Sequence, residues 1–271
     1  MRNIKPSSPS LEAWASSSRN GHPAITLDGA GKRYEAVEAL RPVRLEIHRG
    51  ETVAILGPSG SGKTTLLSLI AAELIPSAGT VHLNGSALAS LRPGRELARQ
   101  VGMIHQQFDL VPNLSALQNV LAGRLGQWSL ARSLFSLVWP QERAVGLAAL
   151  ERVGVLERAN VRAGRLSGGE QQRVAIARLL VQNPEIVLAD EPVSSLDPAR
   201  ADEVLNILIE TAQEADRTLV ASIHSVHLAR DRFSRLVGLR NGAVRFDRPS
   251  DQVTDEMIAS LYDLGGLRAE V

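Results

Sequence analysis

Short apolar runs alternate with longer segments of helical periodicity along most of the chain. The runs occupy residues 52–56, 101–105, 186–189 and 218–223. Each run has the length of a buried strand, and the segments between them are long enough to hold crossover helices. The pattern therefore predicts an α/β fold built on a largely parallel sheet.

Two segments depart from this alternation. From about residue 90 to residue 165 the chain is rich in Leu, Ala and Arg and poor in β-branched residues, which predicts an inserted helical subdomain. The end of the chain, residues 245–271, is expected to form a last strand, a turn around Pro249 and a short helix over residues 254–262.

The first 23 residues are rich in Ser, Asn, Pro and Arg and contain no apolar stretch of signal-peptide length. We expect residues 1–23 to form a disordered arm and residues 24–271 to form a single domain. No apolar run approaches the roughly 20 residues that a membrane-spanning helix needs. The densest stretch, residues 128–139, is shorter, and Arg132 interrupts it. Any membrane association is therefore expected to occur through a partner.

Composition excludes some chemistries and leaves others open. The 30 basic and 29 acidic residues nearly cancel, so charge gives no reason to expect binding to nucleic acid or to an anionic bilayer. The chain has no cysteine, which excludes disulfides, thiolate catalysis and cysteine-ligated zinc.

A glycine-rich segment, GPSGSGKT at residues 57–64, follows the first apolar run and precedes a helical segment over residues 65–74, which Pro76 is expected to end. Glycines allow a tight turn that aims backbone N–H groups at phosphate oxygens, Lys63 neutralises phosphate charge, and Thr64 offers a hydroxyl to Mg²⁺. A plain glycine-rich turn would not require this strand and helix context. The residues expected to bind ATP here are Gly57, Pro58, Ser59, Gly60, Ser61, Gly62, Lys63, Thr64 and Thr65.

Two carboxylates, Asp190 and Glu191, follow the apolar run of residues 186–189. Ligands of open α/β sheets bind at the carboxyl ends of strands, so this position suits catalysis. Asp190 is expected to hold Mg²⁺, directly or through water, and Glu191 to act as the base or to position water. Alone, an acidic pair before Pro192 is more often a solvated turn. The phosphate-binding segment upstream favours the catalytic interpretation.

The segment LSGGE, residues 166–170, opens a helical run over residues 171–182 that Asn183 and Pro184 are expected to end. Ser167 is predicted to be the N-cap, and Ser167 with Glu170 matches a capping box, which would explain both residues without a ligand. However, Gly168 and Gly169 weaken a helix start and make sense if an anion approaches the backbone there. A second phosphate site in one chain suggests that it serves a nucleotide held by another copy.

Four segments, GPSGSGKTT, LSGGEQQRVAIARLL, IVLADEP and SSLD, together resemble the motifs of ATP-binding-cassette ATPases, in the expected order. The resemblance extends from about residue 25 to residue 262. It implies a P-loop NTPase fold with a RecA-like, mostly parallel sheet, an inserted helical subdomain and an antiparallel N-terminal β portion. It also makes Ser167, Gly168, Gly169 and Glu170 the signature that contacts ATP in a partner copy.

The resemblance assigns roles to four further residues. Tyr34 lies where the family has an aromatic that stacks on adenine, Gln106 where a glutamine contacts Mg²⁺, and Asp197 where the chain contacts the opposite site. His224 matches a histidine that contacts the γ-phosphate, and its spacing fits the family better than that of His227. Each residue alone also has an ordinary explanation as a packing or loop residue. The expected catalytic residues are Lys63, Gln106, Glu191 and His224. The expected Mg²⁺ ligands are Thr64, Gln106 and Asp190.

Within this family the chain resembles the ATPases of phosphonate importers. Three segments carry this resemblance: NVLAGRLG at residues 119–126, the following SLARSLFSLV, and LADEPVSSLDP. It departs from them at His105, at Glu170 and at Ser225. The apolar residues 128–139, with Leu134 and Phe135, are expected either to dock a permease helix or to pack the subdomain's own core.

The resemblance implies an ATPase that uses ATP and Mg²⁺, dimerises around two nucleotides and works with permease subunits and a substrate-binding protein at the cytoplasmic face of the inner membrane. Other hypotheses are an exporter of lipoproteins or peptides, an importer of another oxyanion, a DNA-repair ATPase and a small-molecule kinase. The DNA-repair ATPase would need a long coiled coil, and the sequence has no sustained heptad. The kinase would leave LSGGE and SSLD without a role.

Overall fold

The computed structural model describes residues 22–127, 142–194, 196 and 198–262. Three regions with sequence predictions lie outside the described residues. They are residues 1–21 of the expected arm, the apolar segment 128–139 with Leu134 and Phe135, and Asp197. Within the described ranges, no helix combines the length and apolar character needed to cross a membrane.

A six-stranded sheet organises the domain, with strand order β10-β9-β3-β8-β7-β6. Its strands are β10 (Ala243–Pro249), β9 (Arg235–Arg240), β3 (Thr52–Leu56), β8 (Thr218–Ser222), β7 (Ile186–Asp190) and β6 (Val101–Ile104). Neighbouring strands pair in parallel except β9 and β10, which are antiparallel. The four strands predicted from apolar runs are confirmed as β3, β6, β7 and β8, and the parallel α/β class with them.

A second sheet, with order β2-β1-β4-β5, is antiparallel throughout. Its strands are β1 (Ile25–Tyr34), β2 (Val37–Ile47), β4 (Ala78–Leu83) and β5 (Ser86–Ala87). This sheet is the antiparallel N-terminal portion that the family resemblance implied. One face is buried and the other is polar, because Leu27, Leu45 and Ile47 are buried while Asp28, Arg44 and Glu46 alternate with them in exposed positions.

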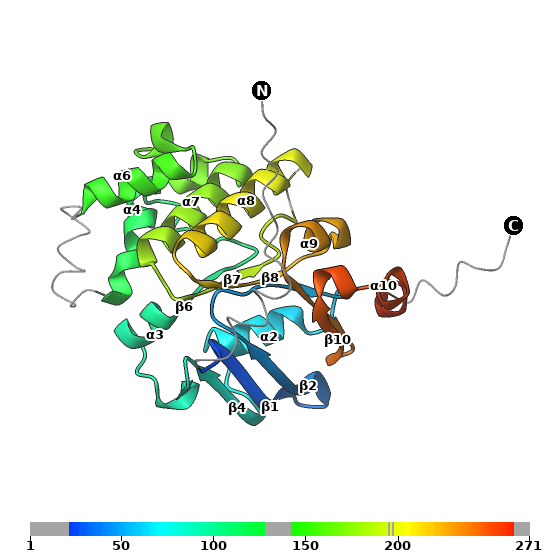
Figure 1. The fold of residues 1–271 in the computed structure, drawn as a ribbon. Helices are drawn as coiled ribbons and strands as arrows, with labels where there is room; N and C mark the ends of the chain where they lie inside the picture. The colour runs from blue at the N-terminus through cyan, green and yellow to red at the C-terminus, as the bar shows by residue number, and fades with distance from the viewer. Residues whose placement is uncertain (1–21, 128–141, 195, 197, 263–271) are drawn as a thin grey trace, which may run out of the picture.

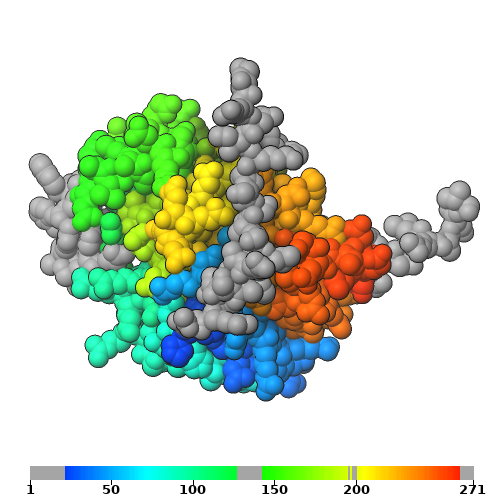
Figure 2. Space-filling view, viewed as in Figure 1, coloured from blue at the N-terminus to red at the C-terminus, as the bar shows by residue number. Residues whose placement is uncertain are grey.

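Eight α-helices surround the sheets within the described residues (Figure 1). They are α2 (Lys63–Ile70), α3 (Arg95–Gln100), α4 (Ala116–Leu121), α6 (Arg143–Arg152), α7 (Gly168–Gln182), α8 (Pro198–Glu214), α9 (Val226–Arg232) and α10 (Asp255–Tyr262). Helix α2 lies between the two sheets, and α7 and α8 cover the opposite face of the six-stranded sheet. In the space-filling view, the residues around α6 (green) lie at the upper left and those of β1 and β2 (blue) at the bottom (Figure 2).

The core divides into two clusters, one on each face of the six-stranded sheet. Strand β3 contributes to both, because Val53 and Ile55 belong to the cluster around α2, whereas Ala54 and Leu56 belong to the cluster under α7 and α8. Alternate side chains of a strand point to opposite faces, so a strand covered on both sides is apolar throughout. The uninterrupted apolar runs of the sequence follow from this arrangement.

Between residues 90 and 165 the described chain is helical or irregular except for β6, which joins the six-stranded sheet beside β7. Helices α4 and α6 pack against α7. Helix α2 ends at Ile70, four residues before the end expected from Pro76, because Ala72 has the left-handed φ of 63° and breaks the helical path. Helix α10 begins at Asp255 and ends at Tyr262, as predicted within one residue.

Candidate functional site

The glycine-rich segment joins the end of β3 to the start of α2 and forms a tight turn. Gly57 has a φ of 152° and Gly62 a φ of 104°, a region that favours glycine. A Cβ on Gly57 would lie 2.0 Å from the carbonyl oxygen of Leu239, and one on Gly62 would lie 2.7 Å from that of Ala39. These two glycines are therefore required by the turn and by its close approach to neighbouring backbone.

Lys63 begins α2 and points back into the turn. Its Nζ donates to the carbonyl oxygens of Gly57, at 2.9 Å, and Pro58, at 3.2 Å. The side chain is buried, and this burial lowers its pKa, although the charges of Glu191 and Asp190 act in the opposite direction. The turn thus holds a buried cation whose two hydrogen-bond acceptors are neutral carbonyl groups, and an anion that replaced them would be a stronger acceptor.

The carboxyl ends of β6, β7 and β8 bring together three of the predicted catalytic residues. Glu191 follows β7, and its Oε1 lies 2.5 Å from Nε2 of His224, which follows β8. Nε2 of Gln106, which follows β6, donates to Glu191 Oε2 at 3.2 Å. Glu191 is therefore held between two polar side chains at one edge of the sheet, as expected for a site at the carboxyl ends of parallel strands.

Asp190 is the last residue of β7 and is buried. Its Oδ1 accepts a hydrogen bond of 2.7 Å from Ser222, and the backbone N–H of Glu191 donates to the same hydroxyl, also at 2.7 Å. Glu191 itself has the left-handed φ of 49°, which is uncommon for a residue with a side chain. The acidic pair is thus held by a polar network in the sheet and is not a solvated turn.

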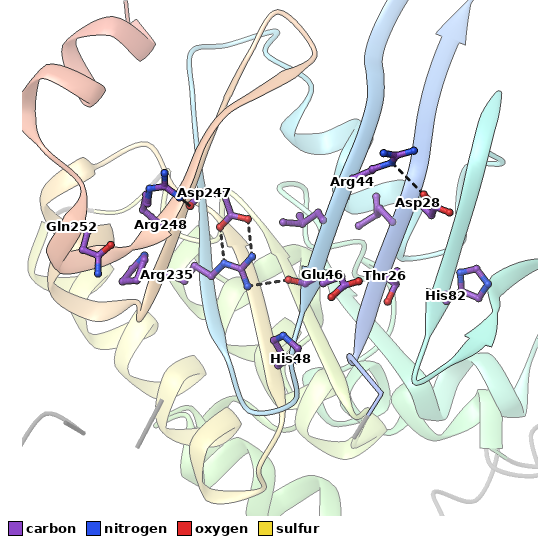
Figure 3. Close-up of a pocket in the computed structure, with 13 residues that line it drawn as sticks. Thr26, Asp28, Arg44, Glu46, His48, His82, Arg235, Asp247, Arg248 and Gln252 are labelled. Carbon is purple, nitrogen blue, oxygen red and sulfur yellow. Dashed lines mark hydrogen bonds and ion pairs between the residues drawn. The ribbon is translucent and has the colours of Figure 1, made fainter. Parts of the chain in front are cut away.

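A pocket of about 880 Å³ lies away from these residues, between the polar face of the antiparallel sheet and the strands β9 and β10 (Figure 3). Its main charges already have partners. Arg235 pairs with Asp247 and Glu51 and donates to the carbonyl oxygen of Glu46, and Arg44 pairs with Asp28. The bond from Arg235 to Glu46 joins the two sheets, and the ion pairs of Arg235 and Arg44 brace the strands on either side of it, so we assign this pocket a structural role.

A smaller pocket, of about 530 Å³, is lined by six of the nine residues of the glycine-rich turn that were predicted to bind ATP, and not by Gly57, Pro58 or Ser61. It is lined by Ser59, Gly60, Gly62, Lys63, Thr64, Thr65 and Glu191, together with residues of β2 and the turn after β9. Its volume suits a small ligand. The larger pocket has the greater volume, but the smaller one is lined by both the buried cation Lys63 and the carboxylate of Glu191, so we choose it as the candidate site.

Tyr34 ends β1 with 46% of its surface exposed. The Nζ of Lys32 lies 5.2 Å from the centre of the ring, and the same ammonium donates to the carbonyl oxygen of Ile75 at 2.8 Å. Tyr34 is not among the residues that line the smaller pocket. Its ring is thus accessible for stacking, with a cation near the ring.

Ser167 and Glu170 form the capping box expected at the start of α7. The Ser167 hydroxyl accepts from the Glu170 N–H at 3.3 Å, and the Glu170 carboxylate accepts from the Ser167 N–H at 2.8 Å. This backbone bond, followed by the bond from Arg158, lowers the pKa of Glu170. Gly168 has open surroundings, since a Cβ added there would meet no atom within 4 Å, whereas a Cβ on Gly169 would lie in ordinary contact with Leu196, at 3.7 Å. None of these four residues lines the smaller pocket, so within the described chain this segment is separate from the glycine-rich turn.

His227, the alternative to His224 in the sequence, makes its ion pair away from Glu191. Its Nε2 pairs with Asp231 at 3.4 Å, one turn along α9, and its side chain is largely exposed. The structure therefore brings His224, and not His227, to Glu191. Sequence reasoning also missed Tyr262, whose hydroxyl accepts a hydrogen bond of 3.2 Å from the N–H of Gly57. No local motif marks a contact between residues so far apart in the chain.

Comparison with known proteins gives the family of the chain. The sequence profile of the ABC transporter family matches residues 40–194. The phosphonates import ATP-binding protein of Anaeromyxobacter dehalogenans is 50% identical over 89% of this chain, which spans 48% of that protein. The protein of the same name from Pseudomonas entomophila is 45% identical over 88% of this chain and 91% of its own length.

Comparison with solved structures also finds ATP-binding cassettes. A dimeric ATP-binding cassette in a post-hydrolysis state, bound to ADP and Pi, superposes with a TM-score of 0.73. It is 33% identical to this chain, and the match covers 83% of this chain and 98% of that one. The chain therefore belongs to the ABC transporter family and has the fold of its nucleotide-binding cassettes.

Proposed function

We propose that this chain hydrolyses ATP to energise the uptake of phosphonates through a separate membrane permease. The observation that carries the hydrolytic role is the position of Glu191, held between His224 and Gln106 beside the glycine-rich turn. The names and identities of the relatives from Anaeromyxobacter and Pseudomonas support the choice of phosphonates as cargo. Fold alone would not specify a cargo.

In this proposal, the glycine-rich turn binds the phosphates of ATP. Lys63 exchanges its bonds to two carbonyl groups for bonds to phosphate oxygens, which are stronger acceptors because they are charged. The backbone N–H groups at the start of α2 add donors and positive potential. The exposed ring of Tyr34 stacks on the adenine.

The same pocket suits Mg²⁺. Thr64 lines the pocket, and two further oxygen ligands lie next to Glu191 of its lining: the amide of Gln106, which is bonded to Glu191, and the buried carboxylate of Asp190, which precedes it. Such oxygen ligands are the ones that this hard cation prefers. Among the described residues no cluster of three or more His, Cys, Asp or Glu is placed to hold a metal by itself, which agrees with a cation bound by one carboxylate and the nucleotide's own phosphates. Bound there, Mg²⁺ would neutralise charge that develops on the phosphates.

Glu191 orients the attacking water and accepts its proton, while His224 contacts the γ-phosphate. Both roles need the two side chains close to one reacting centre, and the proposal is supported by their closeness to each other, with His224 Nε2 at 2.5 Å from Glu191 Oε1. Gln106, bonded to the other oxygen of Glu191, limits the rotation of the carboxylate. A residue held in this way loses less freedom when the reaction begins.

We also propose that two copies enclose two ATP molecules, with Ser167, Gly168 and Gly169 of each copy facing the nucleotide bound by the other, and with Asp197 at the contact between them. Glu170 would hold the signature in place through the capping box. The separation of the signature from the glycine-rich turn within one chain supports this arrangement.

Replacing Gly168 by Ala tests the approach of a partner's nucleotide. No neighbouring atom obstructs the added methyl group, and alanine favours a helix start over glycine by about 0.5–1 kcal/mol, so the free energy of unfolding should stay equal or rise. ATP hydrolysis should nevertheless fall by about tenfold or more, because the methyl group occupies the space that the partner's phosphate needs. Full ATPase activity in a stable variant would contradict the two-copy arrangement.

The remaining parts of the proposed system are permease subunits and a substrate-binding protein, with the ATPase attached to the permease at the cytoplasmic face of the inner membrane. The groove beside β6 and α3, lined by Leu97, Met103 and His105, is one surface available to a permease helix. The contribution expected of Leu134 and Phe135 to this docking falls outside the described residues.

Growth on phosphonate as sole phosphorus source tests the cargo. A strain lacking this chain should fail to grow and should recover with the native chain, but not with Glu191→Gln. Glu210→Gln, the same chemical change at an exposed site on α8, should restore growth like the native chain. Unimpaired growth of the deletion strain would reject phosphonates in favour of another oxyanion or an exported lipoprotein or peptide, while leaving ATP hydrolysis to be measured on the purified protein.

A further inference from the structure

Ser222 occupies a position in the sheet where packing alone would favour an apolar side chain. It is the last residue of β8 and is completely buried, on the same face of the strand as Val220, which belongs to the apolar core. A buried hydroxyl is unfavourable unless its hydrogen bonds are satisfied. Strand register places Ser222 directly beside Asp190 of β7, so the hydroxyl has its partners in the neighbouring strand.

The partners of this hydroxyl determine the direction of both bonds. The backbone N–H of Glu191 can only donate, so the Ser222 oxygen accepts from it at 2.7 Å. An ionised carboxylate can only accept, so the Ser222 proton points to Asp190 Oδ1, also at 2.7 Å. One hydroxyl therefore links the side chain of Asp190 to the backbone of Glu191.

The backbone of Glu191 is anchored at both ends. Its N–H is bound by Ser222, and its carbonyl oxygen accepts from the N–H and the hydroxyl of Ser194, both at 3.2 Å. These bonds hold Glu191 at its left-handed φ of 49°, a conformation that a residue with a Cβ adopts only when its surroundings require it. From this backbone position the side chain reaches His224 and Gln106.

We propose that Ser222 is a positioning residue for ATP hydrolysis, which fixes the carboxylate of Asp190 and the backbone of Glu191 relative to each other through one hydroxyl group. The inference rests on the proposed roles of Asp190 as Mg²⁺ ligand and Glu191 as base. Its effect is to couple these two roles: when the hydroxyl is removed, Asp190 loses a donor and the part-buried N–H of Glu191 loses its acceptor.

The test compares Ser222→Thr with Ser222→Val. Both add bulk at the same buried position and have nearly the same shape, but only threonine keeps a hydroxyl, so any difference between them reports the hydrogen bonds. We expect Ser222→Val to lower kcat by about 10- to 100-fold, the range for losing bonds that involve a charged group, and to raise the Mg²⁺ concentration for half-maximal rate. The KM for ATP should change by less than about threefold, because Ser222 does not line the pocket. Ser222→Thr should recover kcat to within about threefold of the native chain.

Several outcomes would overturn the proposal. If Ser222→Val kept the native kcat and Mg²⁺ dependence, or if Thr and Val were equally impaired, the hydroxyl would have no positioning role. Should the Val variant not fold, Ser222→Ala removes the hydroxyl without added bulk, and the same two readouts apply. The parallel variant Glu191→Gln separates this inference from the proposed function: full activity of Glu191→Gln would reject the role of Glu191 itself, whatever the result at Ser222.

Discussion

Replacing Glu191 by Gln is expected to lower ATP turnover by about 10³-fold while ATP still binds. Glutamine has the size of glutamate and can keep hydrogen bonds to His224 and Gln106, so the geometry of the strand ends should persist. The amide cannot accept a proton from water, and loss of a positioned base typically costs between about 10²- and 10⁴-fold. Phosphate release measured at saturating MgATP, with Glu210→Gln as the matched control, checks this expectation.

The same variant should accumulate a complex of two chains with ATP. ATP favours the closed pair only because it makes more contacts there than in the separated chains, and without hydrolysis these contacts are not lost. Light scattering at saturating MgATP should show a rise in mass from one chain of 29.1 kDa towards two. A variant that binds ATP but stays a single chain under these conditions would reject the proposed arrangement of Ser167 to Gly169 against a partner's nucleotide.

The parts of the site that sequence reasoning located are those that depend on local sequence. The turn before α2 needs glycine at positions with unusual φ, and the N-cap of α7 needs a side-chain acceptor, so short motifs mark both. The acidic pair was located for a related reason, since an apolar run ending in carboxylates predicts the end of a parallel strand. These predictions required no knowledge of which strands are neighbours.

The parts that were missed depend on tertiary neighbours. Ser222 meets Asp190 only because β7 and β8 pair in one particular register, and Tyr262 meets Gly57 only because α10 packs back onto the sheet. Strands β1 and β2 are half polar along their length, since one face of their sheet is open to solvent, and apolar runs therefore did not reveal them. Helix α2 ends early, at Ile70, because Ala72 is left-handed, and alanine is a residue type that gives no signal for that conformation.

Replacing Lys63 by Met is expected to remove most of the stabilisation that ATP provides. At 100 times its Kd, ATP should stabilise the native chain by about 2.7 kcal/mol, which corresponds to about 5–10 °C in Tm for a domain of this size. Loss of the charged bonds from Lys63 to phosphate should weaken binding by about 100-fold, so the shift at the same ATP concentration should fall to about 1 °C. Arg44→Met, which removes a cation at an exposed site on β2, should keep the full shift.

The same variant should also change how stability depends on pH when no ATP is bound. Burial lowers the pKa of Lys63 in the folded chain below its ordinary value of 10.5. Between these two pKa values the unfolded chain binds more protons than the folded one, so this group makes the free energy of unfolding rise as pH increases through that interval. Methionine has no proton to lose, and urea unfolding of Lys63→Met should lack this rise. An identical pH dependence in the native chain and in Lys63→Met would mean that Lys63 is solvated in the free protein, and that its burial against Gly57 and Pro58 does not oppose its charge.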